Sequence, residues 1–229
     1  MHRRGRFVVL RELAQDDLDR AAEMWGDPDA TRFLTADPMT RQQAAEALRR
    51  ARLSAVAPDR RTYHLAIAQH DGVLVGSVAV NLEGGSSAYV HSLVLHPRAR
   101  NLALAGADAA RLTAAFCFED LGRHRFWCMC REDNTSARRL YVSLGMSQQG
   151  LFREVDCKEG RRHNHLVFDW LAPEWEARRK PPPQRRHPDV VIARPGGADA
   201  DTTVERLRRR APEAPAVGGI EAADQRRCR

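Results

Sequence analysis

The chain has 229 residues, of which 43% are hydrophobic and 29% are charged. These proportions are typical of a globular protein, and no window approaches the run of about 18 apolar residues that a membrane-spanning helix needs. The net charge of +7 is compatible with a nucleic-acid partner and equally with a phosphorylated cofactor, because both bind arginine and backbone amides.

Apolar periodicity and turn residues divide most of the chain into strands and helices. In chain order the pattern predicts a strand at residues 7–13, helices at 16–25 and 40–51, strands at 64–68, 73–80 and 87–95, a helix at 105–121, a strand at 125–130, a helix at 134–144, and strands at 146–156 and 163–170. Runs of antiparallel strands with inserted helices favour a three-layer α+β domain, with a mostly antiparallel, twisted sheet of about six to seven strands and about four helices.

Local signals set the ends of several of these elements. Asp16 and Thr40 are typical residues for capping a helix, and Gly145 is placed to close the helix before it. Asp71-Gly72 is a strong hairpin turn between two apolar runs. Because these signals are local, we expect the predicted ends to be accurate at these places.

Composition changes near Pro173. Residues 173–229 hold eight of the twelve prolines, and the run at 178–186 contains three of them in succession. Such a run cannot continue a helix or a sheet. We therefore predict a folded domain at residues 1–172 and a disordered tail at 173–229. The tail is either a basic arm that contacts RNA or a partner, or a dispensable extension.

The five cysteines are odd in number and match no disulfide framework. The start of the chain is basic and no apolar core follows it, so we expect no secretion signal, a cytoplasmic protein and reduced thiols. Cys128 and Cys130 would share one face of a strand. A zinc site would need two more ligands, and His163 and His165 are the only nearby pair of a suitable kind. We prefer buried structural thiols and expect no metal.

The segment from Leu93 to Gly106 carries chemical information. A strand ends, Pro97 turns the chain, and small residues open a helix. A helix that begins in this way presents free backbone N–H groups at its positive end, which is a natural site for pyrophosphate. On spacing alone, an ordinary loop between a strand and a helix is the alternative.

A second segment supplies a more specific pattern. Asn134, Ala137, Tyr141 and Gly145 follow a predicted strand with the spacing Asn-x-x-Ala-x-x-x-Tyr-x-x-x-Gly. This pattern resembles the GNAT family of N-acetyltransferases, in particular the Rim-type branch that acetylates the amino termini of ribosomal proteins. Met146 replaces the phenylalanine that is usual after the glycine. The resemblance spans roughly residues 7–172 and implies the GNAT fold.

The resemblance implies acetyl-coenzyme A as the donor and no metal. In this family the strand before the loop pairs with the pantetheine arm, which corresponds here to the backbone of Leu93, Val94 and Leu95. Asn134 and Ala137 are expected beside the coenzyme, although Asn134 is also a plain helix cap. The pyrophosphate loop corresponds to Arg100, Asn101, Leu102, Ala103, Leu104, Ala105 and Gly106, with alanine at position 103 in place of the expected glycine and with a register shifted by one residue left open.

The implied reaction is the transfer of an acetyl group to a primary amine, on a protein amino terminus or a small molecule, by direct attack in a ternary complex. The amide of Leu95 corresponds to the oxyanion donor. Tyr141 is placed by the family pattern to protonate the leaving thiolate, and a core tyrosine is the alternative. His91 is our candidate base, with a packed histidine or a water chain to Glu83 or Asp29 as alternatives.

The acceptor amine is expected near the loop around Pro28, where relatives line the acceptor groove. Acidic side chains in this region would attract an ammonium group, although they could equally be solvated turn residues. The candidate acceptor-binding residues are Asp27, Asp29, Phe33 and Glu83.

The alternative function is a non-catalytic acyl-coenzyme A binder or sensor of the same fold, because the loop is poor in glycine and the strand at 87–95 lacks a glutamate. The expected partners are acetyl-coenzyme A and an amine acceptor, with a homodimer as one open assembly. No membrane partner is expected, and the basic tail is the only candidate for contact with nucleic acid.

Overall fold

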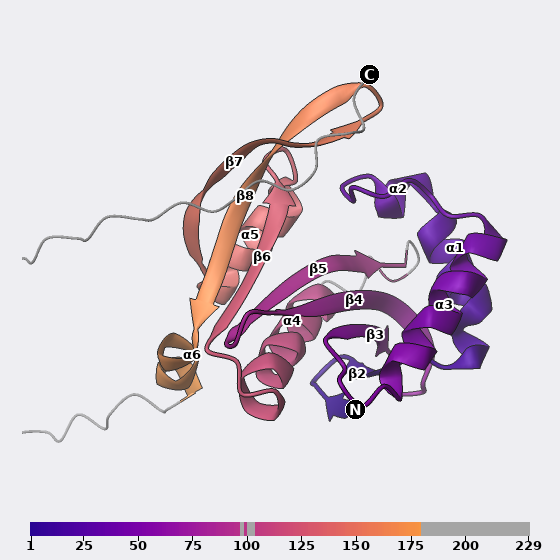
Figure 1. Cartoon of the computed structure of the whole chain (residues 1–229), viewed down its shortest axis with the longest axis horizontal. Coiled ribbons are helices and arrows are strands. Elements are labelled where there is room, and N and C mark those ends of the chain that lie inside the picture. The colour runs from indigo at the N-terminus through magenta and orange to yellow at the C-terminus, as the bar shows by residue number, and fades with distance from the viewer. Residues whose placement is uncertain (97–98, 100–103, 180–229) are drawn as a thin grey trace, which may run out of the picture. The chain divides into compact units, whose positions relative to one another are not determined.

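The fold is built on one eight-stranded sheet, with strand order β1-β2-β3-β4-β5-β6-β8-β7 (Figure 1). The structure is a computed structural model and describes residues 1–96, 99 and 104–179. All neighbouring strands are antiparallel except β5 and β6, which run parallel. The strands are β1 (His2–Arg4), β2 (Val9–Glu12), β3 (Thr62–Ala68), β4 (Leu74–Glu83), β5 (Ser87–Leu95), β6 (Arg125–Arg131), β7 (Ser147–Lys158) and β8 (Arg161–Leu171).

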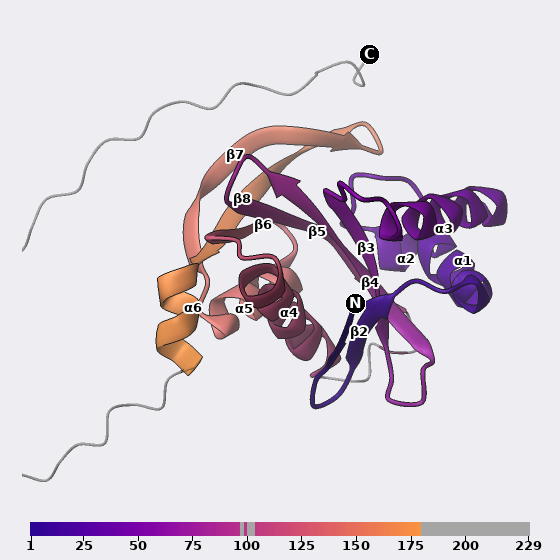
Figure 2. The same cartoon turned by 60° about the horizontal axis from the view of Figure 1, so that its bottom comes forward.

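Helices cover both faces of the sheet (Figure 2). Within the described residues, none of them is long and apolar enough to cross a membrane. A short 3-10 turn, η1 (Gln15–Asp17), precedes α1, and a π-helical turn, η3 (Phe116–Asp120), follows α4. The α-helices are α1 (Leu18–Gly26), α2 (Pro28–Thr31), α3 (Arg41–Ala55), α4 (Ala105–Ala115), α5 (Thr135–Leu144) and α6 (Ala172–Arg179).

Two apolar clusters hold the layers together. The larger cluster joins one face of the sheet to α4, η3 and α6, and the smaller one joins the opposite face to α1 and α3. Ala88 and Val90 of β5 belong to the larger cluster. Successive side chains of a strand point to opposite faces, so Tyr89 and His91 project on the face that α1 and α3 share.

Cap and turn chemistry fixes the ends of several elements as the sequence predicted, except at Asp16, which lies inside η1 and caps no helix. Thr40 caps α3, because its Oγ1 accepts from Gln43 N (3.2 Å) while Gln43 Oε1 accepts from Thr40 N (2.8 Å). Gly72 (φ 91°) forms the turn between β3 and β4, and Gly145 (φ 79°) ends α5. Both glycines adopt left-handed conformations that other residues enter at a cost.

The predicted α+β class, with a mostly antiparallel sheet between helical layers, is confirmed, with eight strands and six α-helices in the described residues in place of about six to seven and about four. The pattern missed β1, α2 and α6. β1 consists of His2, Arg3 and Arg4, so it has no apolar alternation to detect. The helix predicted at 105–121 ends at Ala115 and continues as η3.

The chain remains folded beyond residue 172, where the sequence suggested a boundary. α6 begins with Ala172-Pro173, and proline is tolerated in the first turn of a helix. Trp175 is buried, and Arg178 donates to the carbonyls of Leu144 and Gly145 (3.2 and 3.1 Å). The compact unit therefore runs from Met1 to Arg179, while the rest of the predicted tail, residues 180–229, lies outside the described residues.

Asp108 in the first turn of α4 fastens the amino-terminal segment to this helix. Its Oδ2 accepts from the backbone N–H groups of Phe7 (2.7 Å) and Val8 (3.1 Å). One carboxylate therefore serves two backbone donors that lie about a hundred residues away in sequence. Gly5 is packed against the same carboxylate, where an added Cβ would clash with it.

Asp108→Ala should lower the free energy of unfolding by about 2 kcal/mol, because it leaves two backbone donors without an acceptor. Urea denaturation of the full chain measures this change. Asp19→Ala is the matched control, since Asp19 ion-pairs with Arg41 on an exposed surface and should change stability by less than about 0.5 kcal/mol. Equal effects of the two substitutions would contradict the anchoring role.

Candidate active site

β5 and β6 pair for only part of their length and then separate (Figure 1). Their parallel ladder runs from Ser87–Arg125 to Val90–Cys128. Beyond this point β5 continues to Leu95 and β6 to Arg131, and no ladder pair joins the two strands. We call this divergence the fork.

A bulge in β5 accompanies the separation. Ser77 of β4 pairs with Val94, while Ala79 pairs with His91, so β5 has one more residue than β4 between these pairs. The extra length is taken up at Ser92, whose φ is 51°. A bulge of this kind bends a strand and increases its twist. The edge of β5 from His91 to Leu95 that faces β6 therefore keeps backbone donors and acceptors for an extended ligand.

The amino terminus of α4 lies next to the end of β5. A Cβ added to Gly106 would lie 3.6 Å from Leu95 Cδ1, which is an ordinary contact distance. Asp108, the acidic residue of this first turn, directs its carboxylate to the amides of Phe7 and Val8. The backbone N–H groups at the start of α4 can therefore receive an anion. Of the predicted pyrophosphate loop, the structure places Leu104, Ala105 and Gly106, while Arg100, Asn101, Leu102 and Ala103 lie outside the described residues.

Tyr141 reaches the start of the fork from α5. Its ring packs on Phe168 with centroids 5.3 Å apart, and its hydroxyl lies beside the thiol of Cys128, the last β6 residue paired with β5. Burial raises the pKa of Tyr141 well above its ordinary value. The hydroxyl therefore keeps its proton and can donate it.

The predicted caps position Tyr141 on α5. Asn134 Oδ1 accepts from Ala137 N (3.1 Å) at the start of the helix, and Gly145 ends it. Asn134 and Gly145, two residues of the pattern on which the family resemblance rests, thus fix the two ends of the helix that carries Tyr141. The structural role predicted for Asn134 as a cap is confirmed, and its role toward the coenzyme stays a prediction.

His91 approaches the fork from the opposite face. Its Nδ1 lies 3.0 Å from Ser92 Oγ, and its buried Nε2 has no hydrogen-bond partner among the described residues. Burial, followed by the charge of His64, lowers the pKa of His91. A neutral imidazole with a free nitrogen can accept a proton. Cys128, which lies beside the Tyr141 hydroxyl, belongs to the other face, so the predicted acid and base lie on opposite sides of the sheet.

The rings of His91, Tyr89 and Trp127 form a continuous stack across two strands of the sheet. His91 stacks on Tyr89 (5.1 Å between centroids), and Tyr89 stacks on Trp127 of β6 (4.4 Å). Trp127 Nε1 donates to Glu83 Oε2 at 3.1 Å. We call these four residues the aromatic row. The structure therefore brings the predicted residues His91 and Glu83 onto one surface, with Tyr89 and Trp127, which the sequence reasoning missed although their alternation along the strands was a usable signal.

The acidic residues predicted around Pro28 have different environments. Asp27 Oδ1 accepts from Ala30 N (2.9 Å) and caps α2, so the type of this residue is explained by the helix. Asp29 is exposed in the first turn of α2. Phe33 lies beneath the guanidinium of Arg131 at the end of β6, 5.5 Å from ring centroid to Cζ. Phe33 is thus close to the end of β6, whereas the carboxylate of Asp27 is used to cap α2.

Lys158, which the sequence did not single out, fastens the β7–β8 hairpin over this region. Its Nζ donates to the carbonyls of Thr31 (2.9 Å), Leu34 (3.0 Å) and Ala36 (3.1 Å). The three acceptors follow one another at the end of α2 and in the segment after it. One ammonium therefore holds the hairpin and the segment after α2 together.

Three of the four cysteines in the described region, Cys117, Cys128 and Cys130, are free and buried, as the sequence predicted. Cys157 is disulfide-bonded, so the expectation of reduced thiols throughout the chain was wrong at this residue. Burial raises the pKa of Cys117 to about 12 and that of Cys130 to about 11, so both remain protonated thiols. In the part of the chain that the structure describes, no three His, Cys, Asp or Glu side chains are grouped as metal ligands.

Comparisons with known proteins agree with this geometry. A family model described as "Acetyltransferase (GNAT) domain" matches residues 8–147. An uncharacterized N-acetyltransferase p20 of Bacillus licheniformis is 22% identical over 172 residues, which cover 73% of this chain and 94% of that protein. A GNAT-family acetyltransferase from Bacillus anthracis has a similar structure, with a TM-score of 0.66, 17% identity, and coverage of 76% of this chain and 100% of the other.

A spermidine N-acetyltransferase from Vibrio cholerae, solved in complex with CoA and spermine, has a TM-score of 0.65 at 17% identity, with coverage of 74% of this chain and 98% of the other. At these identities the structural likeness concerns the fold. It extends over nearly the whole length of the compared chains.

Lys158→Met should loosen the contact between the hairpin and the segment after α2, because three charge-assisted hydrogen bonds are lost. Hydrogen exchange followed by mass spectrometry on the full chain should show faster exchange in residues 28–40 and 147–171. Residues 105–115 of α4 provide the internal control and should keep their wild-type rates. Uniform acceleration in all three regions would indicate global destabilisation instead.

The lowered pKa of His91 predicts a stability change on acidification. The unfolded chain, whose histidines titrate near the ordinary value of about 6.5, binds the proton more readily than the folded chain. The free energy of unfolding therefore has its full value above about pH 6.5, where His91 is neutral in both states, and it declines as the pH falls through and below that value. Urea unfolding measures the free energy of unfolding at pH 7.5 and 5.5. Its decrease between these two pH values should be smaller in His91→Gln than in wild type. His70→Gln, at an exposed site, is the control and should show the same decrease as wild type. If His91→Gln also shows the wild-type decrease, burial of His91 is not its cause.

Proposed function

Because this chain belongs to the GNAT acetyltransferase family, we propose that it transfers the acetyl group of acetyl-coenzyme A to a primary amine by direct attack in a ternary complex. The observation that carries the proposal is the fork, with Tyr141 at its start on one face and His91 on the other. The sequence-based resemblance is confirmed at the level of the family. The ribosomal-protein branch stays a hypothesis, and a protein amino terminus or a small amine is the proposed acceptor.

The unpaired edge of β5 suits the coenzyme arm. Leu93, Val94 and Leu95 offer backbone groups there, and the start of α4 offers N–H groups for the pyrophosphate. Asn134 Nδ2 makes no hydrogen bond to the described residues and is free to donate to the arm, while Asn134 Oδ1 caps α5. The glycine-poor loop is tolerable, because phosphate binding by backbone N–H groups does not require a particular side chain.

In the proposed reaction, His91 on one face of the sheet acts as the base and Tyr141 on the other face acts as the acid. The amine nitrogen attacks the thioester carbon, a C–N bond forms, and the C–S bond breaks with release of the thiolate. His91 Nε2 accepts the proton that the amine loses. Tyr141 donates its hydroxyl proton to the thiolate on the other side of the fork. The backbone N–H of Leu95, assigned from the family resemblance, stabilises the oxyanion.

The surface that receives the amine combines rings and carboxylates. The aromatic row provides a floor on which an ammonium group can rest. Glu83 at its end and the exposed Asp29 supply negative charge that attracts an amine. Both were predicted as acceptor residues, and both keep that role in the proposal.

Tyr141→Phe should reduce kcat by about 10²- to 10³-fold, because the leaving thiolate loses its acid. Acetyl-coenzyme A affinity, measured by calorimetric titration of the full chain, should stay within about threefold of wild type, since the substitution keeps the ring and its packing. Tyr63→Phe is the control, because Tyr63 packs on Phe116 in the core, and should keep wild-type turnover.

Turnover is measured with a panel of primary amines that includes spermidine and short peptides. Wild-type kcat in Tyr141→Phe would remove Tyr141 from the chemistry. Binding of acetyl-coenzyme A by the wild type without acetylation of any amine would favour the non-catalytic alternative.

A further inference from the structure

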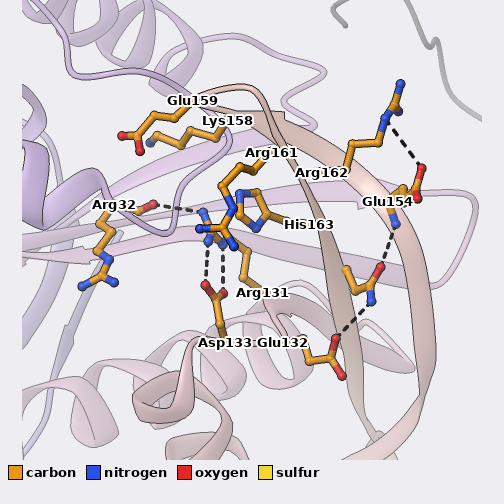
Figure 3. Close-up of a pocket in the computed structure, with 11 residues that line it drawn as sticks. Arg32, Arg131, Glu132, Asp133, Glu154, Lys158, Glu159, Arg161, Arg162 and His163 are labelled. Atoms are coloured by element: carbon orange, nitrogen blue, oxygen red, sulfur yellow. Dashed lines mark hydrogen bonds and ion pairs between the residues drawn. The ribbon is translucent and has the colours of Figure 1, made fainter.

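A cavity of about 670 Å³ opens at the tip of the β7–β8 hairpin, between the hairpin, the end of β6 and the segment after α2 (Figure 3). We call it the tip cavity. Five Arg and Lys and four Asp and Glu side chains line it, giving a net charge of +1. Such a surface is suited to a singly charged anion.

Most of the charged groups around the tip cavity already have partners. Arg131 donates to both carboxylate oxygens of Asp133 (3.0 and 2.6 Å). Arg162 pairs with Glu154 at 3.7 Å, and Lys158 donates to backbone carbonyls. Within the described residues, the guanidinium of Arg161 has neither an ion pair nor a hydrogen bond.

The unpaired guanidinium points to other nitrogen donors. Figure 3 shows Arg161 extending toward Arg131 and His163, whereas Arg162 turns the other way to Glu154. Arg161 and His163 are two residues apart on β8 and share a face. Arg131 is buried, with 7% of its surface exposed. Arg161 is exposed and lines the same cavity, and because Asp133 already balances the charge of Arg131, the guanidinium of Arg161 is left to bind an added anion.

The tip cavity lies on the same face of the sheet as the aromatic row. Trp127 and Arg131 alternate with Cys128 and Cys130, which are in the core on the other face. Arg131 is three residues beyond Cys128, where the fork starts, and this corresponds to about 10 Å along a strand. A single extended molecule can therefore place an amine at the fork and a negative group in the cavity.

We propose that the tip cavity, whose near edge at Arg131 lies about 10 Å from the start of the fork, binds a carboxylate of the acceptor through Arg161 and His163, with Arg131 held beside them by Asp133. The inference rests on the proposed function and specifies its substrate class, an amine that also carries an acid. A planar guanidinium matches a carboxylate in two parallel hydrogen bonds. An extended tripeptide spans about 10 Å, so its terminal carboxylate reaches the near edge of the cavity, and the long side chain of Arg161 can extend to it.

A pair of tripeptides tests the proposal on the full chain, one with a free terminal carboxylate and the other with a carboxamide. Wild type should show a KM about tenfold lower for the acid at similar kcat, because the carboxylate contributes equally to substrate and transition-state binding. Arg161→Gln should abolish this difference. Arg162→Gln, altered at the next position of the same strand, should retain it.

A second pair of peptides identifies the source of the carboxylate. Both are longer and amidated at their carboxyl ends, and they carry either glutamate or glutamine at the third position. An Arg161-dependent preference for the tripeptide acid alone assigns the cavity to a free carboxyl terminus, and a preference for the glutamate peptide alone assigns it to an acidic side chain near a protein amino terminus. Absence of a preference in both pairs overturns the proposal.

Binding measurements without coenzyme separate this inference from the proposed function. Ligand-observed NMR compares the tripeptide acid and its amide on wild type, Arg161→Gln and Arg162→Gln. If no amine is acetylated, the proposed function fails, yet tighter binding of the acid that depends on Arg161 would still support the cavity. Equal binding of the acid and the amide to wild type would overturn it even in an active enzyme.

Discussion

The bulge at Ser92 is the constraint on which the arrangement of the site depends. A regular β5 would continue its ladder with β6, and its backbone groups would be consumed by the sheet. The positive φ of Ser92 and the early end of the parallel ladder leave an open strand edge inside the sheet. Open edges invite pairing with another extended segment, and here the edge lies between two helical layers where a small ligand can use it.

The connection between the two parallel strands brings the second part of the site. Parallel neighbours need a crossover, and α4 forms it. The helix must begin close to where β5 ends, so the positive end of its dipole lies beside the open strand edge. Asp108 would weaken this field if it faced the helix end, but its carboxylate is held by the amides of Phe7 and Val8. The amino-terminal segment thus contributes to the electrostatics of a site that it does not touch.

The sequence predicted the locally determined parts of the fold better than the parts of the site that depend on contacts between distant segments. The bounds of β5 and the caps of α5 were predicted well, because Gly145 and Asn134 act on their own neighbours. β1 was missed because its residues have no apolar alternation, and α6 was missed because it is fixed by the packing of Trp175 in a core built from distant strands and helices. Asp27 was assigned to the acceptor although it caps α2. Alternation along each strand indicated the faces of Tyr89 and Trp127, but the pairing of distant strands that brings the residues of the aromatic row and of the tip cavity together is not encoded locally.

The three hydrogen bonds of Lys158 also bear on the chemical durability of the protein. Lys158 is the only lysine in residues 1–179, and its ammonium uses all three of its N–H groups on backbone carbonyls. An acetylated Nζ keeps a single N–H group, so acetylation of Lys158 would break two of these three contacts. The folded part of an acetyl-transferring protein therefore has its single lysine fully engaged with its own backbone.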